Sequence, residues 1–203
     1  MRVKIYVEGG GNDNSRLCAE LRQGFQSLFI KAGFGGKLPS VIASGGRAEA
    51  FHDFQIAIRK SKLGEVILLL VDSEGGIEDG VTKWDYVKTR VGDNWEQPKN
   101  ANENNLFFMI ECMESWFLAD KDALKNFYGK DFHENSLLKN TNFESISKQN
   151  VYSSLENATK GTIKGRYGKG THSFKILGML DPQKIKDHGT YAREFFERIE
   201  ELS

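Results

Sequence analysis

The sequence has no excess of charge of either sign. Its 203 residues contain 28 lysines and arginines against 28 aspartates and glutamates. A global basic field that would attract nucleic acid is therefore absent, and any such partner has to be bound through a local patch.

Cysteines and long apolar runs are also scarce. The two cysteines, Cys18 and Cys112, lie in segments with apolar periodicity, which predicts reduced, buried thiols in a cytoplasmic protein. No apolar run approaches the roughly 18 residues that span a bilayer, and the first residues, MRVKIYVEGG, are typical of a strand and not of a signal peptide. We therefore expect no membrane partner. The 4 histidines show no metal-binding spacing, which argues against zinc.

The most informative stretch is EVILLLVDSE, residues 65–74. An unbroken apolar run from Val66 to Val71, bounded by polar residues and glycines, favours a strand buried on both faces of a parallel sheet. Asp72 and Glu74 follow at its carboxyl end, where ligands of such sheets bind. Their spacing puts both carboxylates on one side of an extended segment, which would suit a hard cation, Mg²⁺ or Mn²⁺.

Strands and helices are expected to alternate over the first two thirds of the chain. This order predicts a three-layer, Rossmann-like α/β fold with a mainly parallel sheet. We expect a single domain, residues 1–203, with a core of about 1–128 and a helical C-terminal extension of about 129–203. The expected strands cover residues 2–7, 40–43, 66–71 and 106–110, and the expected helices cover about 15–32, 48–62, 84–91, 112–127, 151–159, 174–180 and 191–202.

Acidic residues follow three of the predicted strands. Glu8 follows the first, Asp72 and Glu74 the third, and Glu111 the fourth, and Glu114 is placed one helical turn beyond Glu111. A parallel sheet brings these ends to one edge, so the carboxylates are expected to converge and to need one or two Mg²⁺ ions. Solvated acids at ordinary strand ends are the alternative. Glu8 would serve either as a further ligand or as a general base.

Basic residues gather in two places. Lys160, Lys164, Arg166, Lys169 and Lys175 surround His172 in a glycine-rich stretch without acids. Such a stretch could bind nucleic-acid phosphates, although a solvated loop is an equal alternative. The second place is the turn Ser44-Gly45-Gly46-Arg47, which could hold a phosphate at a helix start through backbone N–H groups and Arg47.

Two motifs resemble those of Toprim domains, which occur in topoisomerases, primases and OLD-type nucleases. Val7-Glu8-Gly9-Gly10-Gly11-Asn12 is similar to their first motif, and Leu69-Leu70-Val71-Asp72-Ser73-Glu74 is similar to their DxD motif with glutamate in place of the second aspartate. The resemblance implies Mg²⁺-dependent phosphoryl transfer on nucleic acid, with Glu8 in acid–base work and Asp72 and Glu74 holding metal.

A third motif is more specific. The stretch IECMESWFLAD, residues 110–120, resembles the ExxExW-LxAD pattern of a Toprim-like family of unknown function, DUF4276, which includes RloG-like proteins. That family is associated with bacterial restriction and anti-phage defence, sometimes beside an ATPase. The resemblance therefore implies a defence role and an ATPase subunit as a partner.

These observations lead to one principal hypothesis and two alternatives. The principal hypothesis is a Mg²⁺-dependent (or Mn²⁺-dependent) nuclease acting on DNA or RNA, with catalytic Glu8, Asp72 and Glu74 and further metal ligands at Glu111 or Glu114. The first alternative is a non-catalytic subunit that binds nucleic acid or nucleotide and partners an ATPase. The second is a small-molecule phosphatase that uses the same acids.

Overall fold

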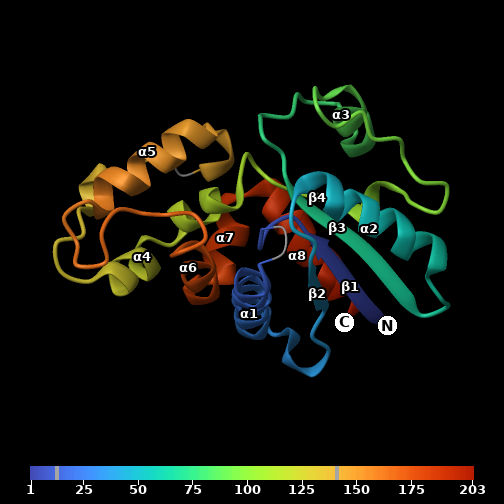
Figure 1. Cartoon of the computed structure of the whole chain (residues 1–203), viewed down its shortest axis with the longest axis horizontal. Helices are drawn as coiled ribbons and strands as arrows, with labels where there is room; N and C mark the ends of the chain where they lie inside the picture. Colours follow the sequence, from blue (N-terminus) through green and yellow to red (C-terminus); the bar gives the residue numbers. More distant parts are fainter. Residues whose placement is uncertain (12–13, 140–141) are drawn as a thin grey trace.

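A four-stranded, entirely parallel sheet lies in one half of the molecule (Figure 1). The computed structural model describes residues 1–11, 14–139 and 142–203. The strands are β1 (Arg2–Val7), β2 (Ser40–Ala43), β3 (Glu65–Asp72) and β4 (Leu106–Met109), in the spatial order β2-β1-β3-β4. Every pair is parallel, with Val7 beside Leu70 and Asp72 beside Met109. The predicted parallel α/β fold is confirmed.

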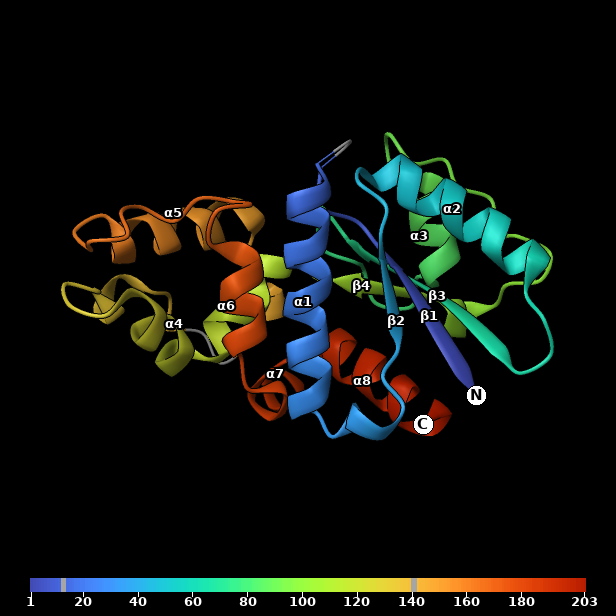
Figure 2. The same ribbon diagram turned by 60° about the horizontal axis from the view of Figure 1, so that its bottom comes forward.

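Helices cover both faces of this sheet, so the fold has three layers (Figure 2). One face packs on α1 (Ser15–Lys31) and α8 (Thr190–Leu202), and the other packs on α2 (Arg47–Lys60) and α3 (Lys83–Thr89). The division follows from the alternation of side chains along a strand, since Leu68 and Leu70 of β3 face the first layer while Ile67, Leu69 and Val71 face the second. Both faces of β3 are therefore buried, which explains why its apolar run is unbroken.

The C-terminal third is helical, as predicted. Its described residues contain α5 (Lys148–Thr159), α6 (Ser173–Met179), α7 (Pro182–His188) and α8. Helix α6 packs against α1, and α5 lies with α4 (Lys121–Tyr128) at the end of the molecule away from the sheet (Figures 1 and 2). None of the helices in the described ranges has the length and apolar character needed to cross a bilayer.

The prediction of a single helix over residues 112–127 is wrong. Cys112 is extended, a 3-10 helix (η3) occupies Met113–Ala119, and α4 begins after Asp120. Asp120 breaks the helix because its carboxylate accepts hydrogen bonds from Ala123 N, Asp181 N and Lys184 Nζ, two of them from a distant segment. Glu111 therefore precedes the 3-10 helix, and the expected shared helical face of Glu111 and Glu114 does not exist.

Smaller expectations are also resolved. Cys112 is buried and Cys18 only half-buried, and both are free thiols. In the polar loop after α3, Trp95 is buried, and its ring centre lies 4.2 Å from that of Phe51. Asn14 caps α1 through a hydrogen bond from Leu17 N, whereas Asn12 of the first motif lies outside the described residues.

Candidate metal centre

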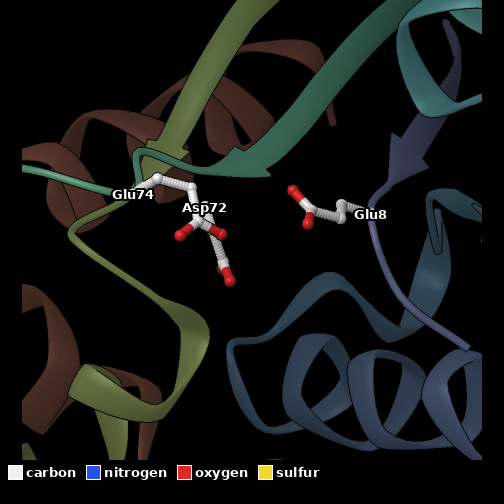
Figure 3. A group of neighbouring side chains, drawn as sticks. All are labelled: Glu8, Asp72 and Glu74. Atoms are coloured by element: carbon white, nitrogen blue, oxygen red, sulfur yellow. The ribbon is translucent and has the colours of Figure 1, made fainter. Parts of the chain in front are cut away.

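Three carboxylates meet at the carboxyl edge of the sheet (Figure 3). Glu8 comes directly after β1, Asp72 is the last residue of β3, and Glu74 lies in the turn that follows. Because β1 and β3 are neighbours in the sheet, one oxygen from each of the three side chains lies within 4.8 Å of the others. The structure thus brings together residues that are up to 66 positions apart in the sequence, Glu8 and Glu74.

Backbone contacts fix the two turns that carry these side chains. Gly9 and Gly45 exchange two backbone hydrogen bonds, of 2.7 and 3.1 Å, so the chain after Glu8 continues alongside the turn after β2. Gly9 has a φ of +131°, and a Cβ there would lie 2.6 Å from Leu21 Cδ1. Glu74, with a φ of 65°, donates its N–H to the carbonyl of Glu111 at 2.8 Å. Both turns are therefore determined by their packing against other segments.

Burial and mutual repulsion make the centre electrostatically unusual. Asp72 is 4% exposed, and one of its oxygens accepts the N–H of Met113 at 2.8 Å. Burial, with the charges of Glu8 and Glu114, raises the pKa of Asp72 to about 8. Burial also raises the pKa of Glu8. The negative charge of Glu74 acts in the same direction, and the positive charge of Arg47 opposes it. A cation would relieve this crowding.

Two lysines from the C-terminal third reach the carboxylates. Lys148 Nζ lies 2.6 Å from both carboxylate oxygens of Glu74 and 3.9 Å from Asp72 Oδ2. Lys169 Nζ also lies 3.9 Å from Asp72 Oδ2. The sequence predicts Lys169 as a phosphate-binding residue but gives no signal for Lys148, because a single lysine at a helix start carries no recognisable pattern.

Glu111 and Glu114 take different positions from those of the three clustered acids. Glu111 Oε2 accepts the backbone N–H of Lys148 at 2.7 Å, which secures the start of α5. Glu114 is fully buried, and its Oε1 accepts a hydrogen bond from the hydroxyl of Tyr167 at 2.8 Å. Glu114 Oε2 has no hydrogen-bond partner among the described residues. Glu114 is close enough to influence Asp72 electrostatically, but it is not part of the group of carboxylates that lie within 4.8 Å of one another.

Arg47 is engaged by the protein itself. Its guanidinium donates hydrogen bonds of 2.7 Å from Nε and Nη2 to the two carboxylate oxygens of Asp93. Its Nη1 donates to Glu8 Oε2 at 3.4 Å and to the carbonyl of Asp72, and the group lies over the ring of Trp95. In this arrangement Arg47 holds the ends of β1 and β3 together, whereas the predicted role was to cradle a phosphate.

The predicted basic stretch is only partly directed at the carboxylates. Lys169 reaches them, but His172 is buried, and its Nδ1 lies 3.0 Å from the hydroxyl of Tyr128. Tyr167 and Thr162 are buried too, so the glycine-rich segment is anchored to the protein. Four further basic residues of the stretch are exposed: Lys160, Lys164, Arg166 and Lys175.

A cavity of about 290 Å³ opens beside the acids. It combines charged groups with an apolar wall and the backbone of the glycine turn after β1, so it could accept a polar ligand with an apolar part. Its lining includes Glu8, Gly9, Gly10, Gly11, Asp72, Lys169, Leu17, Met113 and Phe174.

The donor set fits a hard divalent cation. Carboxylate oxygens are the ligands that Mg²⁺ and Mn²⁺ prefer, and Glu8, Asp72 and Glu74 offer three within 4.8 Å of one another. The raised pKa of Asp72 shows that burial and the neighbouring acids disfavour its ionised form, which a divalent cation would stabilise.

Comparison with known families gives one result. Residues 7–200 match the model of a family described as "Domain of unknown function (DUF4276)". No curated protein and no solved structure matches the chain. The matched range includes all of the acids and lysines described above.

Proposed function

The chain belongs to the DUF4276 family, and we propose that it is a metal-dependent nuclease that hydrolyses phosphodiester bonds of DNA or RNA with Mg²⁺ or Mn²⁺. The observation that carries the proposal is the meeting of Glu8, Asp72 and Glu74 within 4.8 Å at the carboxyl edge of the sheet. Two lysines beside them make the same edge attractive to a phosphate. As the resemblance implies, the proposal includes a role in bacterial defence.

Asp72 and Glu74 would hold the metal, with Glu8 either as a third ligand or as the general base. When bound, Mg²⁺ or Mn²⁺ polarises a phosphoryl oxygen and lowers the pKa of bound water. Asp72 is the best-placed ligand because its second oxygen is fixed by the N–H of Met113. Glu114 is a candidate for a further ligand because its Oε2 is unpaired among the described groups. Glu111 is less suited, since its carboxylate already accepts the N–H of Lys148.

The remaining groups have roles that follow from their positions. Glu8 has a raised pKa and lies at the edge of the cavity, so it can accept a proton from an attacking water. Arg47 orients Glu8 from behind. Lys169, which lines the cavity and is more than half exposed, can bind a phosphate oxygen of the substrate.

The test is cleavage by the purified protein. Supercoiled plasmid, single-stranded DNA and RNA are incubated with MnCl₂, MgCl₂ or EDTA. Asp72→Asn and Glu74→Gln keep the side-chain shape and should each lower cleavage by at least about a hundredfold. Asp79→Asn is the matched control, since Asp79 is an exposed carboxylate shortly after Glu74. This variant should cleave like wild type. Cleavage that persists unchanged in Asp72→Asn would exclude this centre as its source.

One observation favours a second function, a non-catalytic subunit that binds nucleic acid or nucleotide beside an ATPase. Lysine and arginine already neutralise part of the acid cluster, because Lys148 contacts both oxygens of Glu74 and Arg47 contacts Glu8. Such a subunit would bind nucleic acid in a salt-dependent way, would not cleave it, and would bind equally well after Asp72→Asn. Filter binding at several salt concentrations separates the two functions.

A further inference from the structure

Lys148 occupies the oxygens that a metal ion would need. Its ammonium contacts both carboxylate oxygens of Glu74 at 2.6 Å and lies 3.9 Å from Asp72 Oδ2. Nothing in the sequence motifs points to this residue, which lies 74 positions from Glu74. Among the described residues, no other group donates a hydrogen bond to the Glu74 carboxylate.

The position of Lys148 is built into the start of α5. Ser147 caps the helix, and the backbone N–H of Lys148 donates a 2.7 Å hydrogen bond to Glu111 Oε2. Glu111 in turn accepts the N–H of Glu74 through its carbonyl. The start of α5 and the turn after β3 are thus joined through one residue. These contacts involve the backbone and place the Lys148 side chain beside Glu74 whatever the side chain itself binds.

A divalent cation and this ammonium compete for the same atoms. Mg²⁺ requires its oxygen ligands at about 2.1 Å in octahedral geometry, while Lys148 engages both oxygens of Glu74 at 2.6 Å. Two cations within a few ångströms also repel each other, most strongly where water is partly excluded. Glu74 therefore cannot keep both hydrogen bonds to Lys148 and act as a full metal ligand.

We infer that Lys148 is a built-in competitor for the metal, whose ammonium has to leave Glu74 when a divalent cation binds. The inference rests on the metal centre of the proposed function and adds a residue that sets the affinity of that centre. The freed ammonium stays at the same edge of the sheet, where an anionic substrate phosphate is its natural new partner. Metal binding and the position of the Lys148 side chain are thereby coupled.

Lys169 supplies a matched comparison. Its ammonium also lies 3.9 Å from Asp72 Oδ2, but among the described residues it makes no hydrogen bond to Glu8, Asp72 or Glu74. Removing either lysine removes one positive charge near the acids, whereas removing Lys148 also vacates two ligand oxygens. Direct competition therefore predicts a larger effect for Lys148, and a general field effect predicts similar effects for both.

Titration calorimetry with MnCl₂ tests the inference without any substrate. Lys148→Met should bind Mn²⁺ at least about tenfold more tightly than wild type. Lys148→Arg keeps the charge and should stay within about threefold of wild type, and Lys169→Met should gain no more than about threefold. Thermal unfolding followed by circular dichroism checks that each variant is folded. We expect the Lys148 variants to fold, because the hydrogen bond to Glu111 comes from the backbone N–H of residue 148.

The outcomes separate the inference from the proposed function. If wild type binds Mn²⁺ and Lys148→Met binds it equally or more weakly, or if Lys169→Met gains as much, competition by Lys148 is overturned while the metal centre stands. If wild type and all of the variants fail to bind Mn²⁺, both the metal centre and the inference fall.

A second readout follows the lysine itself. Lys148 should react faster with N-hydroxysuccinimide acetate when Mn²⁺ is present, because its ammonium is then released from Glu74. Peptide mass spectrometry measures the acetylation of each lysine, and Lys88, an exposed lysine on α3, serves as the internal reference. Glu74→Gln should give the fast rate without metal. A rate that Mn²⁺ leaves unchanged or slows would contradict the inference.

Discussion

Arg47 forms a bidentate ion pair with Asp93, in which Nε and Nη2 each donate a hydrogen bond of 2.7 Å to one of the two carboxylate oxygens. The Asp93 side chain is only 2% exposed. The same guanidinium lies 4.7 Å from the centre of the Trp95 ring and donates its Nη1 to Glu8. The Arg47 side chain, which is 13% exposed, therefore connects the loop after α3 to the acid centre, and its bidentate geometry is demanding.

Arg47→Lys should lower the free energy of unfolding by about 1–3 kcal/mol, because an ammonium cannot reproduce the planar fork or lie flat on Trp95. Urea unfolding followed by Trp fluorescence measures the change. Arg90 also pairs with Asp93, at 3.0 Å, but its side chain is 24% exposed. Arg90→Lys is thus the matched control and should cost less than about 1 kcal/mol. Equal costs for the two variants would contradict a special role for Arg47.

Asp72→Asn should stabilise the protein in EDTA. With its pKa raised to about 8, Asp72 has to take up a proton or bury a charge when the protein folds at neutral pH, whereas a neutral amide does neither and can still accept the N–H of Met113 through Oδ1. We expect a rise in Tm of about 2 °C or more. With excess Mn²⁺ the order should reverse, because only wild type gains the binding free energy of the ion. Differential scanning calorimetry in the two buffers checks both results.

A lower Tm of Asp72→Asn in EDTA would mean that the carboxylate is already neutralised, with the lysines as the obvious source. The Asp79→Asn variant should show neither effect, since that side chain is exposed.

The fold was accessible from the sequence because its strongest signal is local. The apolar run of β3 and the acids at the ends of β1 and β3 are contiguous patterns, and the rules for parallel sheets bring such ends to one edge. The meeting of Glu8, Asp72 and Glu74 followed from these rules. By contrast, the division of residues 112–127 into η3 and α4 depends on Asp120 bonding to a segment more than 60 residues away.

The partners of these acids could not be predicted from the sequence, because they too come from distant segments. Lys148 reaches Glu74, and Asp93 reaches Arg47, across 74 and 46 residues respectively. Neither residue belongs to a motif, and only the packing of the C-terminal helices and of the loop after α3 brings it to the centre. Ion pairs of this kind depend on tertiary structure and leave no local periodicity.

Tyr167→Phe should destabilise the protein by about 1–3 kcal/mol, because it leaves a fully buried Glu114 without the 2.8 Å hydrogen bond to Oε1. In a Glu114→Gln background the same change should cost about 1 kcal/mol or less, since a neutral amide is easier to bury unpaired. Chemical unfolding of the four proteins completes a double-mutant cycle. Identical costs in the two backgrounds would show that the hydroxyl does not act through the carboxylate.

His172 should make the protein less stable in mild acid. Burial, together with the charges of Lys175 and Lys164, lowers the pKa of His172 in the fold, and its Nδ1 faces the hydroxyl of Tyr128. The unfolded chain therefore binds a proton first as the pH falls below the ordinary value of about 6.5, and stability is lost from there down to the folded pKa. The loss is at most about 1.4 kcal/mol per pH unit.

Urea unfolding at pH 7.5, 6.5, 6.0 and 5.5 measures this effect. His172→Gln should have a flatter profile than wild type below pH 6.5, although it starts from a lower stability because it loses packing against Phe127 and Tyr128. His52, exposed on α2, provides the control, and His52→Gln should follow the wild-type profile. If His172→Gln loses stability as steeply as wild type over this range, the acid sensitivity arises from other groups, and the neutral, buried imidazole is not its cause.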